Sequence, residues 1–257
     1  MSALGADVRP GSGIPVVLLH GFAGNRLVWK PVIDRLPPEL FLIAYDLPGH
    51  AGSLDYPEAG PPKVAAKAVL ADLAARGIPH AHLVGHSMGG AIATLAAMTE
   101  PGRVASLTLL APGGYGPEID AALLRRLASV ADAGELRECF RHMSRRPVEI
   151  AQAEWDAAYR LRTVEGQAEM LQKIAALITR DDRQGMIPAE LVAGIEAPTR
   201  VLWGEDDGVV PFAQTANLPA RFDLVRLPAT GHMLIEEAPE EVAAAILTQA
   251  AREGAHS

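Results

Sequence analysis

A serine, a histidine and an aspartate that lie far apart in the chain could together form an activated nucleophile. The stretch GHSMG (residues 85–89) holds Ser87 between glycines, Asp206 and Asp207 follow a later apolar run, and His232 follows another. A serine hydroxyl attacks poorly until a base removes its proton, and that base needs an acid to fix its tautomer. The serine, an acid and the histidine therefore predict nucleophilic attack on a carbonyl group.

The glycines around Ser87 predict a particular turn. HLVGH (residues 82–86) has the pattern of a strand and MGGAIATLAAMTEP (residues 88–101) that of a helix, so Ser87 is expected on the turn between them. A sharp strand-to-helix turn strains the nucleophile's backbone, and small neighbours relieve the crowding. We expect Gly85 and Gly89 to let the turn form, and Gly90 to let the helix approach the sheet.

Alternating strands and helices predict the fold class. Short apolar runs that end in turn residues indicate strands buried on both faces; they cover residues 15–20, 40–46, 82–86, 104–112, 198–204 and 222–228. Helical patterns lie between them, as at 63–77, and another closes the chain at 238–253. This order predicts an α/β fold with a mainly parallel sheet flanked by helices. At most one short edge strand fits before the first run.

One long segment departs from this alternation. Residues 116–190 contain only helical patterns, which predicts a helical cap inserted into a core formed by residues 1–115 and 191–257. The arginine pairs at 125–126 and 145–146 would suit an acidic substrate, but we expect them to pair with neighbouring acids. Trp155, Tyr159 and Leu161 either line the pocket or form the core of the cap, and we expect the core.

Composition narrows the classes of partner. Hydrophobic residues make up 49% and charged residues 21% of the 257 residues, and the formal net charge is −8. This favours a globular protein without nucleic acid or an anionic membrane as partner, because both are bound by basic surfaces. With Cys139 as the single cysteine and no targeting or membrane-spanning run, we expect a cytoplasmic location. Cys139 is expected to pack as a small apolar residue.

Five stretches, in order, resemble the motifs of the α/β-hydrolase superfamily: LLHGFAGN (18–25), AYDLPGHAGS (44–53), GHSMGG (85–90), WGEDDGVVP (203–211) and GHM (231–233). The resemblance covers nearly the whole chain. It implies a triad of Ser87, His232 and Asp207, with Asp206 as the alternative acid. It also implies an oxyanion hole formed by the backbone N–H groups of Phe22 and Met88.

The resemblance also implies which reactions to expect. Haloalkane dehalogenases and epoxide hydrolases of this fold have an aspartate where this chain has Ser87, so we expect acyl chemistry without a metal or cofactor. Hydrolysis of a small-molecule carboxylic ester or lactone is the first expectation. LTLLAPGGYGPEID (107–120) is similar to acyltransferase components of acetoin dehydrogenase complexes and, more loosely, to carbon–carbon bond hydrolases of ring-fission products. Acyl transfer to a lipoyl or other thiol, carbon–carbon bond hydrolysis and non-enzymatic ligand binding are the alternatives.

The remaining motif histidines have a structural interpretation. His20, His50 and His86 lie in the motif loops, where we expect them to fix turns by hydrogen bonding. The other histidines, His80, His82, His142 and His256, do not have metal-ligand spacing among themselves. Nothing in the sequence indicates the oligomeric state.

Overall fold

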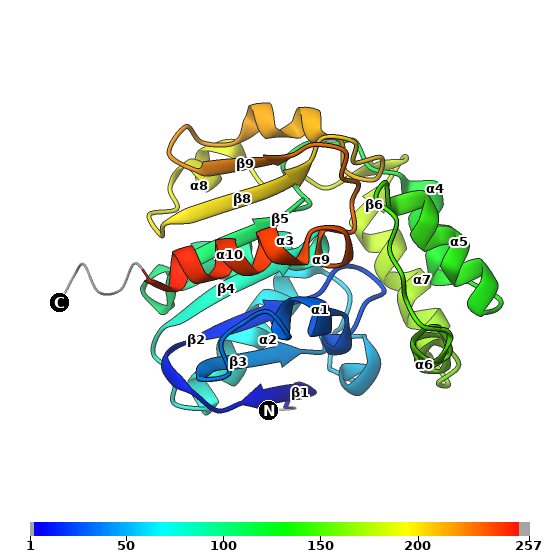
Figure 1. Cartoon of the computed structure of the whole chain (residues 1–257), viewed down its shortest axis with the longest axis horizontal. Coiled ribbons are helices and arrows are strands. Elements are labelled where there is room, and N and C mark those ends of the chain that lie inside the picture. Colours follow the sequence, from blue (N-terminus) through cyan, green and yellow to red (C-terminus); the bar gives the residue numbers. More distant parts are fainter. Residues whose placement is uncertain (1–2, 252–257) are drawn as a thin grey trace.

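A computed structural model describes residues 3–251 and contains one large sheet (Figure 1). Its strands lie in the order β1-β3-β2-β4-β5-β8-β9, and all are parallel except β1. They are β1 (Ala6–Arg9), β2 (Ser12–Leu19), β3 (Leu40–Tyr45), β4 (Ala81–His86), β5 (Val104–Leu110), β8 (Thr199–Gly204) and β9 (Asp223–Leu227). Each of the six predicted runs overlaps one of these strands, which confirms the mainly parallel α/β sheet.

The first strand protects one edge of the sheet. β1 has four residues and pairs antiparallel with β3, with Arg9 opposite Leu42. Its central residues Asp7 and Val8 are exposed, and a short edge strand with charged residues discourages pairing with a second sheet. The expectation of one short edge strand before the first apolar run is confirmed.

Helices cover both faces of the sheet. α1 (Lys30–Ile33) and α10 (Pro239–Ala250) lie on one face, while α2 (Pro62–Ala75) and α3 (Met88–Thr99) lie on the other (Figure 1). Every residue of β4 is buried, because a central parallel strand has helices on both sides. The indole rings of Trp29 and Trp203 are fully buried in this core. The predicted helix at 238–253 corresponds to α10, and its last two residues lie outside the described residues.

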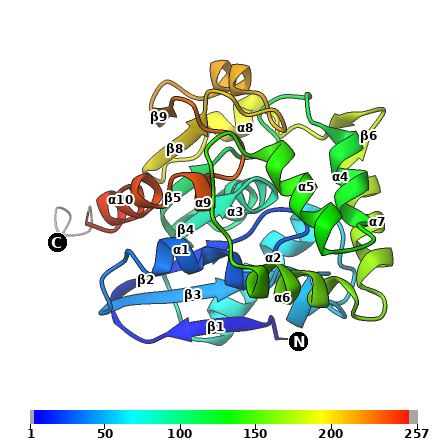
Figure 2. The ribbon, with the colours of Figure 1, turned by 45° about the vertical axis from the view of Figure 1, so that its right-hand side comes forward.

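The predicted helical insertion leaves the sheet after β5. It contains α4 (Ala121–Ala128), α5 (Ala133–Met143), α6 (Gln152–Arg162) and α7 (Gln167–Ile178), which stand together at one end of the sheet (Figures 1 and 2). The expectation that this segment contains only helices was wrong. A hairpin of β6 (Thr179–Arg180) and β7 (Arg183–Gln184) follows α7. Its turn residues Asp181 and Asp182 have φ of 51° and 56°, as a tight hairpin turn requires.

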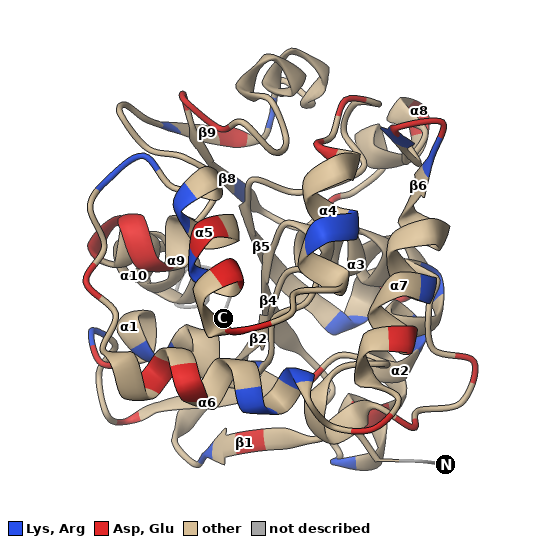
Figure 3. Cartoon of the chain, turned by 90° about the vertical axis from the view of Figure 1, so that its right-hand side faces the viewer, with Lys and Arg blue, Asp and Glu red and all other residues tan. Residues whose placement is uncertain are grey.

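The charged residues of the insertion are interspersed by sign (Figure 3). Arg125 pairs with Asp182 at 2.7 Å, and Arg126 pairs with Glu135 at 3.0 Å and Glu138 at 2.7 Å. The expectation that these arginines pair with neighbouring acids is confirmed for Arg125 and Arg126.

The interior of the insertion is apolar. Trp155 is buried with its ring edge-on to Phe140 at 5.3 Å between centroids, and Cys139 is fully buried. Trp155 and Cys139 therefore pack in the core as predicted. Tyr159 and Leu161 are half-buried.

Candidate active site

Ser87 occupies a strained turn between β4 and α3. Its φ of 52° and ψ of −114° lie in a region that residues with a Cβ rarely adopt. A Cβ added at Gly89 would lie 2.2 Å from the carbonyl oxygen of Leu19, and one at Gly85 would lie 2.2 Å from the carbonyl oxygen of Gly89. No side chain fits at either position, so the predicted need for small neighbours is confirmed.

His232 and Asp207 are joined in a buried pair. The Nδ1–H group of His232 donates a hydrogen bond of 2.7 Å to Oδ2 of Asp207, and 3% of His232 and 6% of Asp207 are exposed. The second oxygen, Oδ1, accepts hydrogen bonds from the backbone N–H groups of Val209 at 2.8 Å and Val210 at 2.9 Å. These bonds fix the carboxylate, which in turn orients the imidazole so that Nε2 is free of the proton.

The neighbouring acid points elsewhere. Asp206 is exposed, while its backbone N–H donates to the carbonyl oxygen of Thr230. The structure therefore places Asp207, and not Asp206, against His232.

The residues expected to bind an oxyanion border the same cavity as Ser87. Phe22 and Met88 both line it. Met88 is the first residue of α3, and the N–H groups of a first helical turn have no partner within the helix. The N-terminal end of a helix also favours negative charge, so the position of Met88 suits an oxyanion.

Three buried histidines stabilise the surrounding loops. Nε2 of His20 accepts from the N–H of Leu47 at 3.0 Å, and Nε2 of His50 accepts from the N–H of Ala23 at 3.2 Å. His86 donates from Nε2 to the carbonyl oxygen of His232 at 2.8 Å. These bonds confirm the expected turn-fixing role.

Burial keeps all three rings neutral. It lowers the pKa of His20 to about 4 and the pKa values of His50 and His86 to about 3.

A carboxylate that the sequence reading missed joins the histidine loop to the insertion. Oε2 of Glu237, on α9 (Leu234–Glu237), accepts from the N–H groups of Gly231 at 3.0 Å and of Arg145 and Arg146 at 2.7 Å each. Oε1 accepts from the N–H of Met233 at 3.1 Å. Glu237 thus binds both flanks of His232 and the segment after α5. The only signal in the sequence was an acid next to an apolar run.

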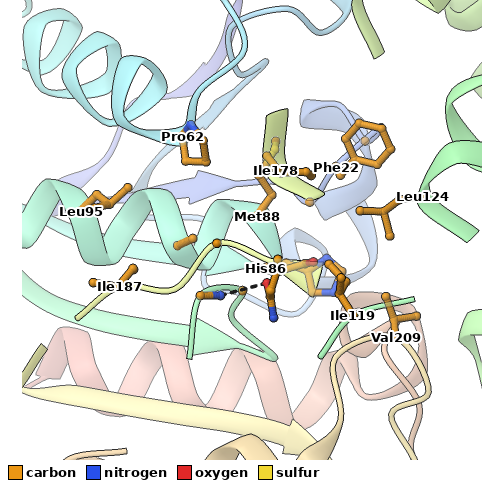
Figure 4. A pocket seen from close by; sticks show the side chains of 18 of the residues that line it. Phe22, Pro62, His86, Met88, Leu95, Ile119, Leu124, Ile178, Ile187 and Val209 are labelled. Atoms are coloured by element: carbon orange, nitrogen blue, oxygen red, sulfur yellow. Dashed lines mark hydrogen bonds between the residues drawn. The ribbon is translucent and has the colours of Figure 1, made fainter. Parts of the chain in front are cut away.

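A cavity of about 550 Å³ opens beside Ser87 and His232. Its walls are mostly apolar, and α4 of the insertion contributes Leu124 and Leu127. In Figure 4, Pro62, Leu95 and Ile187 lie on one side of His86, while Phe22, Leu124 and Val209 lie on the other. The candidate nucleophile therefore faces an apolar space that continues in two directions.

One part of the cavity lining reaches the surface. Leu177, Met186 and Leu191 line the cavity although 52%, 56% and 50% of each is exposed. Trp155, Tyr159 and Leu161 are not among the lining residues of this cavity. An apolar rim of this kind suits a substrate with an apolar chain.

Residues 3–251 contain neither a metal-binding cluster nor a membrane-spanning helix. In this part of the chain no group of three or more histidine, cysteine, aspartate or glutamate side chains is arranged to hold a metal ion. Nor is any of its helices both long and apolar enough to cross a bilayer.

The fold and this site define a class of protein, and comparison with known proteins gives the family. Residues 16–245 match the model of the alpha/beta hydrolase family, so the chain belongs to that family. Its sheet and helical insertion also match a solved meta-cleavage product hydrolase of Pseudomonas fluorescens, with a TM-score of 0.84 and coverage of 97% of this chain and 95% of that one. At 19% sequence identity, that likeness concerns the fold alone.

Two curated relatives are more similar in sequence. The dihydrolipoyllysine-residue acetyltransferase component of the acetoin cleaving system of Pseudomonas putida is 34% identical over 230 residues, which cover 90% of this chain and 61% of that protein. The monoacylglycerol lipase abhd6-A of Xenopus laevis is 28% identical over 257 residues, which cover 91% of this chain and 74% of the lipase. The chain thus spans about three fifths of the acetyltransferase component.

Proposed function

We propose that the protein hydrolyses small-molecule carboxylic esters, with Ser87 as nucleophile, His232 as base and Asp207 as the acid that orients it. The observation that carries this proposal is the buried hydrogen bond of 2.7 Å between His232 and Asp207 beside a serine on a strained turn. The apolar cavity next to Ser87 supports an acyl substrate with hydrocarbon character. Residues 116–190 act as the cap over this cavity.

The first half of the reaction forms an acyl-enzyme. Nε2 of His232 takes the proton of the Ser87 hydroxyl while Oγ attacks the ester carbonyl carbon. The N–H groups of Phe22 and Met88 stabilise the oxyanion that forms, and the carboxylate of Asp207 stabilises the imidazolium. The bond to the alcohol oxygen then breaks as Nε2 returns the proton to that oxygen, and the acyl group remains on Ser87.

The second half releases the acyl group to water. Nε2 of His232 takes a proton from water while the water oxygen attacks the acyl carbon. The bond to Oγ breaks, and Nε2 gives the proton back to Ser87. The sum is ester plus water giving acid plus alcohol, with the enzyme unchanged.

Acyl transfer to a thiol is the second candidate. It is favoured by the 34% identity to the acetyltransferase component, whose name specifies a dihydrolipoyllysine acceptor. The acyl-enzyme would be the same, and the thiol would take the place of water. Dihydrolipoamide added to the assay should then raise alcohol release and yield an acyl thioester, whereas a hydrolase yields the free acid.

The test is a steady-state assay of the purified protein on nitrophenyl esters of graded acyl length. We expect turnover by the wild-type protein and essentially none by Ser87→Ala with unchanged thermal unfolding. Retained turnover in folded Ser87→Ala would reject the mechanism. Absence of turnover by the folded wild-type protein, with or without dihydrolipoamide, would reject both candidates in favour of ligand binding.

A further inference from the structure

An arginine of the insertion binds the loop that contains Phe22. Arg162 is the last residue of α6, and its Nη2 donates a hydrogen bond of 2.7 Å to the carbonyl oxygen of Ala23. Its Nη1 donates at 2.8 Å to the carbonyl oxygen of Leu127, which lies in the last turn of α4. One guanidinium group thus joins two helices of the insertion (Figure 2) to a loop of the core.

The charge of Arg162 is bound by carbonyl groups. No carboxylate of residues 3–251 forms an ion pair with it. Burial lowers the pKa of its guanidinium group to about 10, so the group is still charged at neutral pH. The carbonyl groups at the C-terminal end of a helix have partial negative charge and no partner within the helix, which suits the bond to Leu127. The second bond, to Ala23, places the cation against the core.

Two peptide groups connect Arg162 to the N–H group of Phe22. The carbonyl of Ala23 and the N–H of Gly24 belong to one planar peptide group, and that N–H donates to the carbonyl oxygen of Gly21 at 3.1 Å. The carbonyl of Gly21 in turn shares a peptide group with the N–H of Phe22. Among residues 3–251 this last N–H donates to no acceptor, so it can bind an oxyanion.

The loop needs support from outside because Ala23 is strained. Its φ of 59° is left-handed, which costs a residue with a Cβ about 1–2 kcal/mol. The N–H of Ala23 donates to Nε2 of His50 at 3.2 Å, and its carbonyl accepts from Arg162. Both peptide groups that flank Ala23 are therefore held from outside the loop, one by a histidine of the core and one by the insertion.

This chain of hydrogen bonds ends beside the nucleophile, since a Cβ added at Gly21 would lie 3.4 Å from the Cβ of Ser87. Hydrogen bonds in series polarise one another, so a cation at one end makes the N–H at the other end a stronger donor. A donor that is fixed in advance stabilises the oxyanion without reorganisation during the reaction. We therefore expect Arg162 to lower the barrier of the reaction and to leave substrate binding nearly unchanged.

We propose that Arg162 is a positioning residue of the oxyanion hole, so that the reaction depends on the contact between α6 and the loop of Phe22. This inference rests on the proposed function and adds a residue of the insertion to the proposed active site. The N–H of Phe22 keeps its orientation only while α6 is bound to Ala23.

Arg162→Met and Arg162→Lys test this inference on a nitrophenyl ester. Methionine keeps much of the side-chain volume without a donor, while lysine keeps the charge on one nitrogen in place of two. Removal of an oxyanion-hole donor costs about 10²–10³ in kcat, so we expect kcat of Arg162→Met to fall about tenfold or more, with KM within about twofold. Arg162→Lys should retain more of kcat. The control is Arg160→Met, which replaces an exposed arginine of the same helix and should match the wild-type protein.

Two inhibitors separate positioning from a structural role. In heptyl trifluoromethyl ketone, the carbonyl carbon bonds to Oγ of Ser87, the hydroxyl proton passes to Nε2 of His232, and the carbonyl oxygen becomes an oxyanion. Octanamide has the same hydrocarbon chain but serves as a ligand that does not form this bond. We expect Arg162→Met to weaken inhibition by the ketone by about the same factor as kcat, and to leave inhibition by octanamide unchanged.

Wild-type kcat in either folded variant of Arg162 would overturn the inference. So would equal losses of affinity for the two inhibitors, which indicate a general distortion of the cavity. Failure of both variants to fold would give Arg162 a structural role and overturn the inference as well. Absence of Ser87-dependent turnover by the wild-type protein would instead overturn the proposed function, and the inference with it.

Discussion

Asp206 and Asp207 are neighbours in the chain but have different surroundings. Asp207 is held by two backbone N–H groups and His232, whereas the side chain of Asp206 is exposed. A buried carboxylate with several donors can hold an imidazole in one orientation, while an exposed one cannot. The two residues therefore provide a matched pair for testing which acid supports the reaction.

Asp207→Asn should abolish most activity while keeping the fold. The amide oxygen can still accept from Val209 and Val210, but its NH₂ group would face Nδ1 of His232 and force the proton onto Nε2. That tautomer cannot take the proton of Ser87, and the expected loss in kcat is about 10⁴-fold. Asp206→Asn should change kcat little. Similar losses in the two variants, measured on a nitrophenyl ester, would contradict this assignment.

Gly89 tests the packing around the nucleophile. In Gly89→Ala the new methyl group meets the backbone oxygen of Leu19 at the end of β2, so β2 or α3 must move. We expect a loss of about 1–3 kcal/mol in the free energy of unfolding and a lower kcat, because Ser87 shifts with the turn. Gly102→Ala is the control, since nothing lies within 4 Å of its added Cβ. A denaturant midpoint for Gly89→Ala equal to that of Gly102→Ala would contradict the prediction.

At the scale of elements, the histidine loop and the segment after α5 form one hydrogen-bonded unit. The N–H of His232 donates to Met143, and Glu237 accepts from residues of both segments. Movement of the insertion at this point would therefore change the position of the histidine. Glu237 acts through this loop as a positioning residue and does not line the cavity.

Glu237→Gln should weaken this unit. The NH₂ group of the glutamine must face at least one backbone N–H that donates to the carboxylate in the wild-type protein. That buried donor is then unpaired, which costs about 1–3 kcal/mol. We expect a lower free energy of unfolding and a fall in kcat larger than any change in KM, since His232 is displaced. Glu240→Gln, in an exposed ion pair with Arg35, is the matched control, expected to stay within about 1 kcal/mol.

The change in kcat decides whether Glu237 positions His232 or has a purely structural role. A purely structural role for Glu237 would lower stability but leave kcat of the remaining folded protein unchanged. Measurement of kcat well below the unfolding temperature, normalised to folded protein, separates the two roles.

The same elements show what the sequence could predict. Strands such as β4 and β8 were found because burial on both faces produces uninterrupted apolar runs, and the Ser87 turn was found because only glycine fits beside it. The β6–β7 hairpin was missed because its strands have two residues each. Two residues are too few to show the alternating pattern of a strand. Glu237 was missed because its partners Arg145 and Arg146 lie 92 and 91 positions away in the chain.

At the scale of the whole molecule, burial of titratable groups couples stability to pH. His20, His50 and His86 are neutral in the folded protein, with pKa values of about 4, 3 and 3, whereas an unfolded histidine has a pKa near 6.5. Glu236 behaves in the opposite way, since its pKa of about 8 in the folded protein exceeds the ordinary value of about 4.3. The two kinds of group therefore change the stability with pH in opposite directions.

Stability should be greatest near pH 7. Below about pH 6.5 the three histidines bind protons in the unfolded state but stay neutral in the folded state. The free energy of unfolding therefore falls by ~1 kcal/mol per pH unit for each such proton. From about pH 4.3 to 8 the folded state keeps the proton of Glu236 that the unfolded state has lost. The stabilising contribution of Glu236 is therefore full at low pH and is lost progressively as the pH rises to about 8. Urea midpoints at pH 5, 6, 7 and 8.5 measure both slopes. Glu236→Gln should keep the acid-side loss and lose the alkaline one, and a midpoint that rises from pH 7 to 5 in the wild-type protein would contradict the neutral state of the three histidines.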